Sequence, residues 1–496
     1  MGTAGGADHP VSDAKAKAAK PAALTPDLCV IGAGANGIAL AIAAAAFGAP
    51  VVLIDRQATG GRTTSLAAKA LVEAAARIQD MREAGRLGVP VEVPEVNDAL
   101  IHDHVQRALA TTATNQQAER LKALGIHLIQ GEARFIDRGS VQVGDIAIKA
   151  RRFAIATGSR PDIPALPGLA ELNPALILSE DALSELTRLP GRLVVLGGSG
   201  PAVALAQAFR RLGSTVALIC PAGILPEHDA EAVMILRQKL LREGVTLHED
   251  SEAVRVENRR SGLKLTLAGL SGEGTLEASH ILVAGRRRAD IEALDLDLGG
   301  IRSDADGVVV DHSLRTANRR VHALGSCAGG AAAGSRELAG NDHVGIVLRS
   351  VLFRRNGSLD PTGNPRIAWS RPEIASVGDW RAVKDARPGT LRFLRWPFAE
   401  VPAAIAAGRT EGYVKLVTDR KGRLRAVTIV GDGAGELIAP WCVALNAGLD
   451  VKAMAGIALP ELAASDASRR AALSFLASAT TSPRLRRLIG FLRRFG

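Results

Sequence analysis

A glycine-rich turn between two apolar runs constrains the fold of this chain more than any other feature. Residues 28–56 read "LCVIGAGANGIALAIAAAAFGAPVVLIDR", in which Gly32, Gly34 and Gly37 have G-x-G-x-x-G spacing and the second apolar run ends at Asp55. In a dinucleotide-binding unit these glycines allow a tight turn, close approach of a pyrophosphate and packing of helix on strand, and the acid accepts a ribose hydroxyl. The segment therefore predicts a strand, turn, helix and strand that bind a dinucleotide.

The same pattern recurs in the middle of the chain. Residues 191–220 read "GRLVVLGGSGPAVALAQAFRRLGSTVALIC", an internal repeat that accounts for part of the length of 496 residues. Gly197 is kept, but Ser199 and Ala202 occupy the second and third glycine positions, and Cys220 stands where the acid is expected. A side chain at these positions crowds a pyrophosphate, and a thiol is a poor partner for a ribose hydroxyl. The second unit is predicted either to bind a nicotinamide dinucleotide weakly or to serve packing alone.

The composition argues against several classes of protein. The net charge is +10, but aromatic residues make up only 3% of the chain, which argues against a nucleic-acid-binding surface that stacks bases. The apolar runs are shorter than the roughly 20 residues that a membrane-spanning helix needs. Residues 1–26 lack the apolar core of a secretory signal, so we expect a disordered extension and a cytoplasmic protein.

The cysteines and histidines offer no local metal or redox motif. The four cysteines lie far apart in the sequence, at Cys29, Cys220, Cys327 and Cys442. They form neither a redox pair nor a zinc knuckle, and we expect them to be buried small residues. His102 and His104 are two positions apart in a helical stretch and point to different faces, so no metal site is predicted.

Further motifs follow the two units in a fixed order. They include "IATGSRP" at 155–161, "ILVAGRR" at 281–287, "RTANRRVHALGS" at 315–326, and "PEIASVG", "GYVKLV" and "GELI" after residue 371. From Leu28 to its C-terminus the chain resembles the flavoprotein disulfide reductases, the pyridine nucleotide-disulfide oxidoreductase family that includes dihydrolipoamide dehydrogenase and mercuric reductase. The resemblance implies an α/β protein with two Rossmann-like dinucleotide-binding domains and a C-terminal α+β dimerisation domain.

The resemblance also implies domain limits and site residues. After the extension at 1–26 come an FAD-binding domain at 27–160 and 281–355, an NAD(P)-binding-like domain at 161–280, and a dimerisation domain with a basic tail at 356–496. The residues implied for FAD are Gly32, Gly34, Gly37, Asp55, Arg56, Gly61, Ala156, Thr157, Gly158, Gly325 and Ser326. Those implied for NAD(P)H are Gly197, Ser199 and Ala202, and Lys69 matches the family lysine that lies near the flavin, the one catalytic candidate.

The chain departs from the family where thiol chemistry takes place. The family has "GGTCxxxxCxPSK", whereas residues 60–69 read "GGRTTSLAAK", with Thr63 near the first cysteine position and no counterpart for the second. A hydroxyl forms neither a thiolate nor a disulfide, so electron relay through this helix is excluded. Leu459 and Ala464 fall where relatives have a histidine and a glutamate that act on the thiol, and neither moves a proton.

Two further departures affect the flavin site. Ala204 stands where the family has a glutamate that pairs with the lysine, so Lys69 is expected to have lost its partner. Ser326 stands where the family has an aspartate that accepts a hydrogen bond from a ribityl hydroxyl, and a neutral acceptor is weaker than a charged one.

Two functions are compatible with this pattern. The first is an FAD-dependent oxidoreductase that passes electrons from NAD(P)H through flavin directly to a small acceptor such as a quinone, metal ion, dye or oxygen, because the flavin itself stores two electrons. The second is a catalytically degenerate flavoprotein that acts as a scaffold or partner subunit.

A homodimer through residues 356–496 is expected in either case. The tail repeats apolar residues at helical spacing opposite its arginines, so it is predicted either to dock on the dimer or to make weak contact with an anionic membrane. These apolar residues are Leu485, Leu488, Ile489, Leu492 and Phe495.

Overall fold

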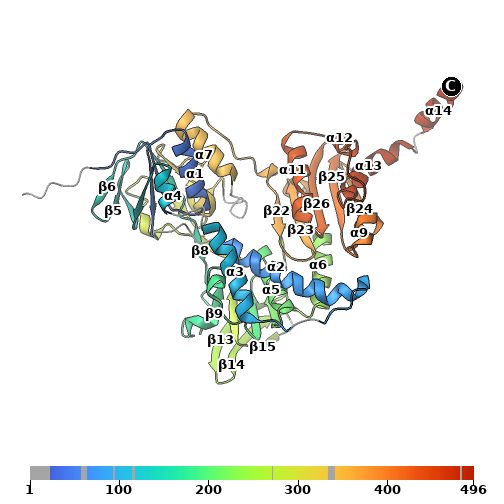
Figure 1. Ribbon diagram of the computed structural model, residues 1–496. Coiled ribbons are helices and arrows are strands. Elements are labelled where there is room, and N and C mark those ends of the chain that lie inside the picture. Colours follow the sequence, from blue (N-terminus) through green and yellow to red (C-terminus); the bar gives the residue numbers. More distant parts are fainter. Residues whose placement is uncertain are drawn as a thin grey trace, which may run out of the picture.

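The computed structural model describes residues 23–56, 64–92, 95–113, 118–270, 272–332, 341–480 and 483–495. Within these ranges the chain forms two parallel sheets covered by helices and a C-terminal antiparallel sheet (Figure 1). This is the α/β architecture with an α+β C-terminal module that the sequence predicts. Gly61 and Thr63, two of the positions discussed above, lie outside the described residues.

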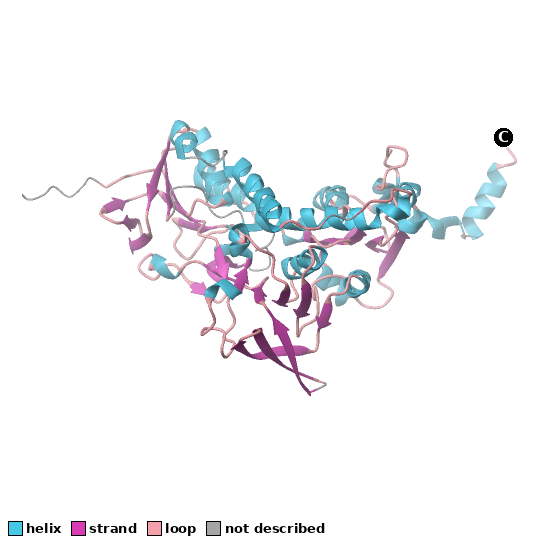
Figure 2. Cartoon of the chain, turned by 60° about the horizontal axis from the view of Figure 1, so that its bottom comes forward, coloured by secondary structure: helices cyan, strands magenta, loops and turns pink. Residues whose placement is uncertain are grey.

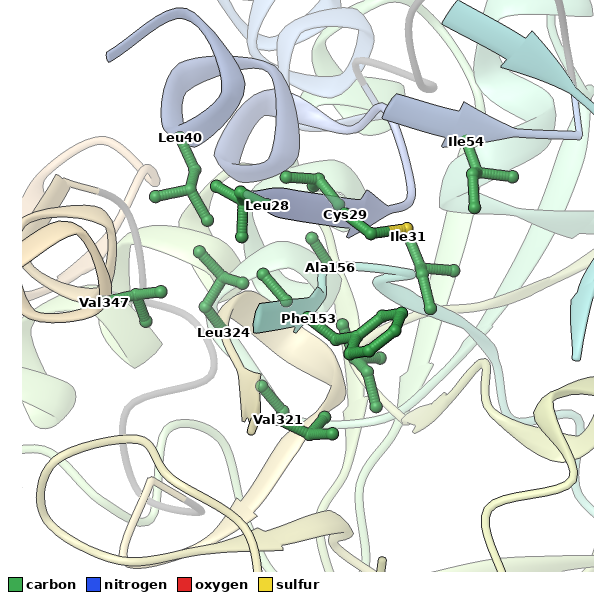
Figure 3. Packing of buried hydrophobic residues seen from close by; sticks show 14 of the residues in the cluster. Leu28, Cys29, Ile31, Leu40, Ile54, Phe153, Ala156, Val321, Leu324 and Val347 are labelled. Carbon is green, nitrogen blue, oxygen red and sulfur yellow. The ribbon is translucent and has the colours of Figure 1, made fainter. Parts of the chain in front are cut away.

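The first sheet has the strand order β20-β7-β1-β2-β3, and all of its pairs are parallel. Its strands are β1 (Leu28–Ile31), β2 (Val51–Asp55), β3 (Ile126–Gln130), β7 (Arg152–Ile155) and β20 (Val321–Ala323). Helices α1 (Ala35–Ala46), α4 (Ala118–Ala123) and α7 (Asn341–Phe353) pack against it. Buried side chains from β1, α1, β7, β20 and α7 meet in one core, which Figure 3 shows around Leu28, Phe153 and Val347.

Smaller strands extend this first unit. The meander β4 (Ala133–Asp137), β5 (Ser140–Val143) and β6 (Ile146–Ile148) follows β3, and β18 (Ser303–Asp304), β19 (Gly307–Val310) and β21 (Ala328–Gly330) form another small sheet. Leu24 forms a bridge with Ile148, and the Lys149 amide donates to the Leu24 carbonyl. The predicted extension at 1–26 is therefore too long, because the chain already pairs with the meander at residue 24.

The second sheet repeats the first, with the order β12-β11-β10-β16-β9 and parallel pairs. Its strands are β9 (Ile177–Ser179), β10 (Arg192–Leu196), β11 (Thr215–Ile219), β12 (Thr246–His248) and β16 (His280–Val283). It is accompanied by helices α5 (Gly200–Arg211) and α6 (Ala230–Arg242) and by the antiparallel strands β13 (Ser251–Arg259), β14 (Gly262–Gly269) and β15 (Gly272–Ala278).

The boundary at which the chain returns from the second unit to the first differs from the predicted domain boundary. Strand β16 pairs with β10 and β9, so the chain returns to the first unit after residue 283 and not at 281. Strands β8 (Ser159–Pro161) and β17 (Arg287–Ala289) then pair with each other as an antiparallel two-stranded connection. The apolar "ILV" of the motif at 281–287 is a buried strand of the second sheet, which sequence order alone did not reveal.

The C-terminal sheet is antiparallel, with the order β22-β23-β26-β25-β24. Its strands are β22 (Arg366–Ala368), β23 (Glu373–Gly378), β24 (Leu391–Pro397), β25 (Tyr413–Asp419) and β26 (Leu424–Gly431). Its helices are α8 (Trp380–Lys384), α9 (Pro402–Ala406), α10 (Ala434–Leu437), α11 (Ala439–Asn446), α12 (Val451–Ala455), α13 (Asp466–Thr480) and α14 (Pro483–Leu492). The side chain of Trp441 is buried in this unit and donates its Nε1–H to Ser468 Oγ at 3.1 Å.

Helix α2 (Thr64–Glu83) packs against the second unit and the C-terminal sheet (Figure 1). Its buried residues Ala67, Leu71 and Ala75 recur every four positions and share one core with α5 and with strands of the C-terminal sheet. Helix α3 (Asp98–Ala113) packs against the same helix. None of the helices in the described ranges combines the length and apolar character needed to cross a membrane.

A buried histidine in the first sheet makes the stability of the fold dependent on pH. The Nε2 atom of His322, on β20, lies 3.0 Å from the hydroxyl of Ser350 on α7. Burial, with the nearby positive charges of Arg152 and Arg315, lowers the pKa of His322 to about 4. The folded protein therefore holds this ring neutral at pH values where an exposed histidine begins to bind a proton.

We expect the free energy of unfolding to fall as the pH drops from about 6.5 toward 4, because there the unfolded state binds a proton that folded His322 does not bind. His322→Gln can keep a hydrogen bond to Ser350. The free energy of unfolding of this variant should fall by about 2 kcal/mol less than that of the wild type between neutral pH and pH 5. Urea unfolding at both pH values measures this difference. The exposed His312→Gln is the matched control, and equal pH dependence in the two variants would contradict the prediction.

Candidate functional site

Two glycines of the first turn have no room for a side chain. Gly32 follows β1 with φ +107°, and a Cβ there would lie 2.4 Å from the carbonyl oxygen of Ala156. A Cβ on Gly37 would lie 1.9 Å from the carbonyl oxygen of Gly32. The turn thus brings the ends of β1 and β7 and the start of α1 into direct contact, as the glycine spacing predicts.

Gly34 differs from these two glycines, because a Cβ at this position would not clash with the rest of the protein. Its φ of −70° suits any residue, and a Cβ there would meet nothing closer than Ala156 O at 3.9 Å. Gly34 is also the N-cap of α1, and no side chain caps this helix. The absent side chain leaves space for a pyrophosphate to approach the backbone at the N-terminus of α1.

Asp55 lies beside this turn at the end of β2. Its Oδ2 accepts a hydrogen bond from the Ala33 amide at 2.6 Å, which fixes the carboxylate at the glycine turn. Arg56, the next residue, forms an ion pair with Asp290 on the return from the second unit. Asp55 occupies the position from which an acid accepts a ribose hydroxyl.

The other side of the site is formed by residues 156–158 and by the short 3-10 helix Gly325–Cys327. The hydroxyl oxygen of Thr157 is buried and has no hydrogen-bond partner among the described residues. A Cβ on Gly158 would lie 3.8 Å from Ser326 Oγ, so these two predicted positions are neighbours. An orphaned hydroxyl and uncapped helix amides at one sheet edge fit a bound dinucleotide.

Sequence reasoning missed two residues of this site. Asn36 lies inside the glycine motif itself, and its Nδ2 would be 2.7 Å from a Cβ on Gly325. The buried His343, at the start of α7, accepts a hydrogen bond from the Gly325 amide through Nδ1 at 3.1 Å. The position of Asn36 within the motif was an available signal, whereas only the fold brings His343 to the site.

Lys69 has partners, contrary to the expectation drawn from Ala204. Its Nζ lies 2.8 Å from Glu73 Oε1 on the next turn of α2 and 3.9 Å from Glu373 Oε1 on β23. The other carboxylate oxygen of Glu373 accepts from the Gly435 amide at 2.9 Å, and burial raises the pKa of Glu373. The expected loss of a partner is therefore wrong, because carboxylates from α2 and from the C-terminal sheet replace the missing one.

At the second glycine turn, a side chain caps the N-terminus of the following helix, α5. Gly197 has φ +128°, and a Cβ there would lie 2.4 Å from Ala284 O, so the tight turn is kept. Ser199 is the N-cap of α5, and its Oγ accepts from the Ala202 amide at 3.3 Å. The serine hydroxyl therefore engages an amide at the helix end where a pyrophosphate would bind, and the side chain of Ala202 is fully buried.

Two charged residues from other elements, Arg237 and Glu249, lie near the end of β11, and the sequence pattern did not indicate them. Cys220 lies there, and burial together with the negative charge of Glu249 raises its pKa to about 12. Glu249 receives two hydrogen bonds from Arg237, at 2.6 Å and 2.7 Å. No motif marks these two residues, because one follows β12 and the other is on α6.

The four cysteines are all free and lie in separate elements. Cys29 is on β1, Cys220 follows β11, Cys327 ends the short 3-10 helix and Cys442 is on α11. Burial raises the pKa of every one of these thiols. Each therefore stays protonated at neutral pH, and thiols in this state are poor nucleophiles.

The segment that replaces the family's acid-base pair lines a pocket of about 420 Å³ in the C-terminal unit. Leu459 is in its wall, together with Glu461 and Asp466. Asp466 is engaged by Arg469 and Arg470, which lie in the same wall. Leu459 thus contributes an apolar side chain to a wall that also holds charged residues.

Comparison with known proteins agrees with this geometry. Residues 26–344 match the family model described as pyridine nucleotide-disulphide oxidoreductase, and residues 364–472 match the dimerisation domain of that family. A mercuric reductase of Streptomyces lividans is 30% identical over 460 residues, covering 90% of this chain and 96% of that protein. A dihydrolipoyl dehydrogenase of Geobacillus stearothermophilus is 27% identical over 443 residues, covering 87% and 92%.

Solved structures share the fold. The crystal structure of LpdA from Mycobacterium tuberculosis superposes with a TM-score of 0.80 at 23% identity, covering 91% of this chain and 99% of that one. The paired parallel sheets, the glycine turn at the edge of the first and the antiparallel C-terminal sheet thus occur together with the matching family models. The chain belongs to the pyridine nucleotide-disulphide oxidoreductase family of FAD-dependent oxidoreductases and carries that family's dimerisation domain.

Proposed function

We propose that this protein passes electrons from NAD(P)H through FAD directly to a small acceptor, such as a quinone, a metal ion, a dye or oxygen, without a protein disulfide. The observation that carries the proposal is the state of the thiols. Helix α2 and the residues leading into it contain no cysteine, and the chain's four cysteines are buried at Cys29, Cys220 and Cys327 and half-buried at Cys442, each with a raised pKa. A thiol in this state does not relay electrons by thiol-disulfide exchange.

The residues of the first turn are assigned to FAD. Gly34 and the uncapped start of α1 would hold the pyrophosphate, Asp55 the adenosine ribose, and Thr157 and Ser326 hydroxyl groups of the bound dinucleotide. Gly32, Gly37, Ala156, Gly158 and Gly325 shape the backbone around them, and Arg56 follows Asp55. Gly61 is assigned to FAD from its place in the sequence alone. When bound, FAD supplies a store for two electrons.

Lys69 is assigned the position beside the flavin that the family lysine occupies. Glu73 and Glu373 neutralise its charge and hold its ammonium group in place. The second turn, with Gly197, Ser199 and Ala202, is assigned to NAD(P)H, with weaker binding because the Ser199 hydroxyl already caps α5. The lost acid-base pair at Leu459 and Ala464 agrees with an acceptor that needs no thiol.

The alternative is a catalytically degenerate flavoprotein that acts as a scaffold or partner subunit. Ser199 and Ala202 at the second turn and Cys220 after β11 favour this alternative, and so does the neutral Ser326 in the first site. Either protein is assigned to the cytoplasm, and either is expected to form a homodimer through the C-terminal unit.

An anaerobic titration of FAD-loaded protein with NADH and NADPH separates the two functions. We expect loss of the oxidised-flavin absorbance, at a rate that is unchanged when each cysteine in turn is replaced by alanine. Flavin that stays oxidised under excess nucleotide, yet is reduced by dithionite, would leave the scaffold as the better account. A cysteine variant that binds FAD normally but is reduced more slowly would overturn the disulfide-free route.

We also propose that α14 docks on an anionic membrane surface. Figures 1 and 2 show this helix projecting from the C-terminal unit. Its apolar side chains are exposed, at Leu485, Leu488, Ile489, Phe491, Leu492 and Phe495. Residues 483–495 contain five arginines and no acid, and the family's dimerisation domain ends at residue 472. A chain with a net charge of +10 repels such a helix, whereas anionic lipids attract it.

Flotation with vesicles tests this docking. The full-length protein should float with phosphatidylcholine vesicles that contain phosphatidylglycerol, and not with phosphatidylcholine alone or at high salt. Arg493→Gln/Arg494→Gln should lower the vesicle partition coefficient by roughly thirtyfold, because each of the two arginines near the surface contributes about 1 kcal/mol. The control, Arg259→Gln/Arg260→Gln, removes the same charge from the β13–β14 turn and should float normally. A tail variant that changes the oligomeric mass and leaves flotation unchanged would place α14 on a second copy of the chain instead.

A further inference from the structure

The carboxylate of Glu249 lies near Cys220, which stands where a dinucleotide-binding unit usually has an acid. Strands β11 and β12 are parallel neighbours, with Ile219 opposite His248. The Cys220 amide donates to the His248 carbonyl at 3.0 Å, so Cys220 and Glu249 leave the sheet side by side at its carboxyl edge. In a dinucleotide-binding unit the adenosine ribose binds at this edge.

The Glu249 side chain is held at one place by three donors. Arg237 donates from Nε to Oε2 at 2.6 Å and from Nη2 to Oε1 at 2.7 Å, and the Ile224 amide donates to Oε1 at 3.2 Å. The side chains of Arg237 and Glu249 are 28% and 22% exposed, so the pair faces solvent at one edge. Hydrogen bonding by Arg237 lowers the pKa of Glu249, and the carboxylate stays charged at neutral pH.

The same loop connects this carboxylate to the glycine turn. The Leu225 amide donates to the Gly198 carbonyl at 2.7 Å, so the segment after β11 lies on the turn that would receive a pyrophosphate. Gly223 lies between them, because a Cβ there would be 3.5 Å from Glu249 Oε1. The carboxylate is therefore connected to the start of α5 through residues 223–225.

The hydrogen-bond capacity of this pair favours one ligand chemistry. A carboxylate has about four acceptor positions, and three donors leave Oε2 able to accept from one more hydroxyl. Arg237 is already bound by two of its nitrogens, and a phosphate brought to this edge would face the negative charge of Glu249. The arrangement suits a ribose with a free 2′-hydroxyl and disfavours one with a 2′-phosphate.

We propose that Glu249 replaces the missing acid at Cys220 and selects NADH over NADPH, with Arg237 holding its carboxylate toward the ribose. The proposal rests on the function proposed above, in which the second unit binds a nicotinamide dinucleotide. The acid thus comes from the residue after β12 and not from the end of β11, where Cys220 stands.

Equilibrium binding of NADH and NADPH to FAD-loaded, full-length protein tests the proposal, with dissociation constants from titration of nucleotide fluorescence. The wild type should bind NADH at least about tenfold more tightly than NADPH. Glu249→Gln removes the charge and releases Arg237, so the ratio of the two constants should fall by roughly tenfold or reverse. In Glu249→Gln/Arg237→Gln the gain in NADPH binding should disappear. Glu252→Gln, an exposed glutamate on β13, is the matched control and should leave both constants unchanged.

The possible results separate this proposal from the broader function. If neither nucleotide binds the wild type, the proposed function itself fails, and this proposal fails with it. If both bind and Glu249→Gln leaves their ratio unchanged, the function stands and the role of Glu249 is refuted. Thermal unfolding of each variant distinguishes a lost ribose contact from a misfolded loop.

Discussion

Gly34→Ala should purify as a folded protein with at least about tenfold less FAD than the wild type. The new methyl group meets nothing in the protein closer than 3.9 Å, and a φ of −70° is ordinary for alanine, so the fold itself should not be disturbed. The methyl group would, however, occupy the space through which a pyrophosphate approaches the first amides of α1. Flavin absorbance of the purified protein, relative to its concentration, measures the effect.

Two other glycine variants serve as controls for Gly34→Ala. Gly191→Ala adds a methyl group where nothing lies within 4 Å and should retain FAD and stability. Gly32→Ala places a Cβ 2.4 Å from Ala156 O at a φ of +107°, so its thermal stability should fall even without FAD. If Gly34→Ala keeps its full complement of FAD, the pyrophosphate does not bind at this turn.

Ser199→Gly should bind NADH roughly tenfold more tightly than the wild type. The change removes the hydroxyl that caps α5 at Ala202 and restores the second glycine of the motif, so the helix amides become available to the pyrophosphate. The loss of the cap should cost only a few tenths of a kcal/mol in stability, because glycine is itself a tolerated N-cap. Titration of the FAD-loaded protein with NADH gives the dissociation constant.

Ser199→Ala separates the two effects of the serine. Alanine also frees the Ala202 amide but keeps a Cβ beside Gly285, where the serine side chain packs. Tighter binding in both variants would identify the hydroxyl as the obstacle, and tighter binding in the glycine variant alone would identify the Cβ. No change in either variant would mean that the second turn is kept for packing.

The structural units of this fold could be predicted from the sequence, because each is marked by motifs of residues that are close together along the chain. Glycine spacing and flanking apolar runs predicted both strand, turn and helix repeats, and the motifs after residue 371 marked the α+β C-terminal unit. Gly32 and Gly37 could be assigned without a structure, since a tight turn against a neighbouring strand excludes a Cβ wherever it occurs. The absence of cysteines from α2 is likewise a property of the sequence alone.

Tertiary structure decided which residues from distant segments act together. Lys69 meets Glu373 because α2 crosses to the C-terminal sheet, and His343 meets Gly325 because α7 packs behind the first sheet. Strand β16 belongs to the second sheet although it adjoins the chain's return to the first. Glu249 lies beside Cys220 only because parallel pairing places the carboxyl ends of β11 and β12 at one edge, and no spacing along the chain encodes that neighbour.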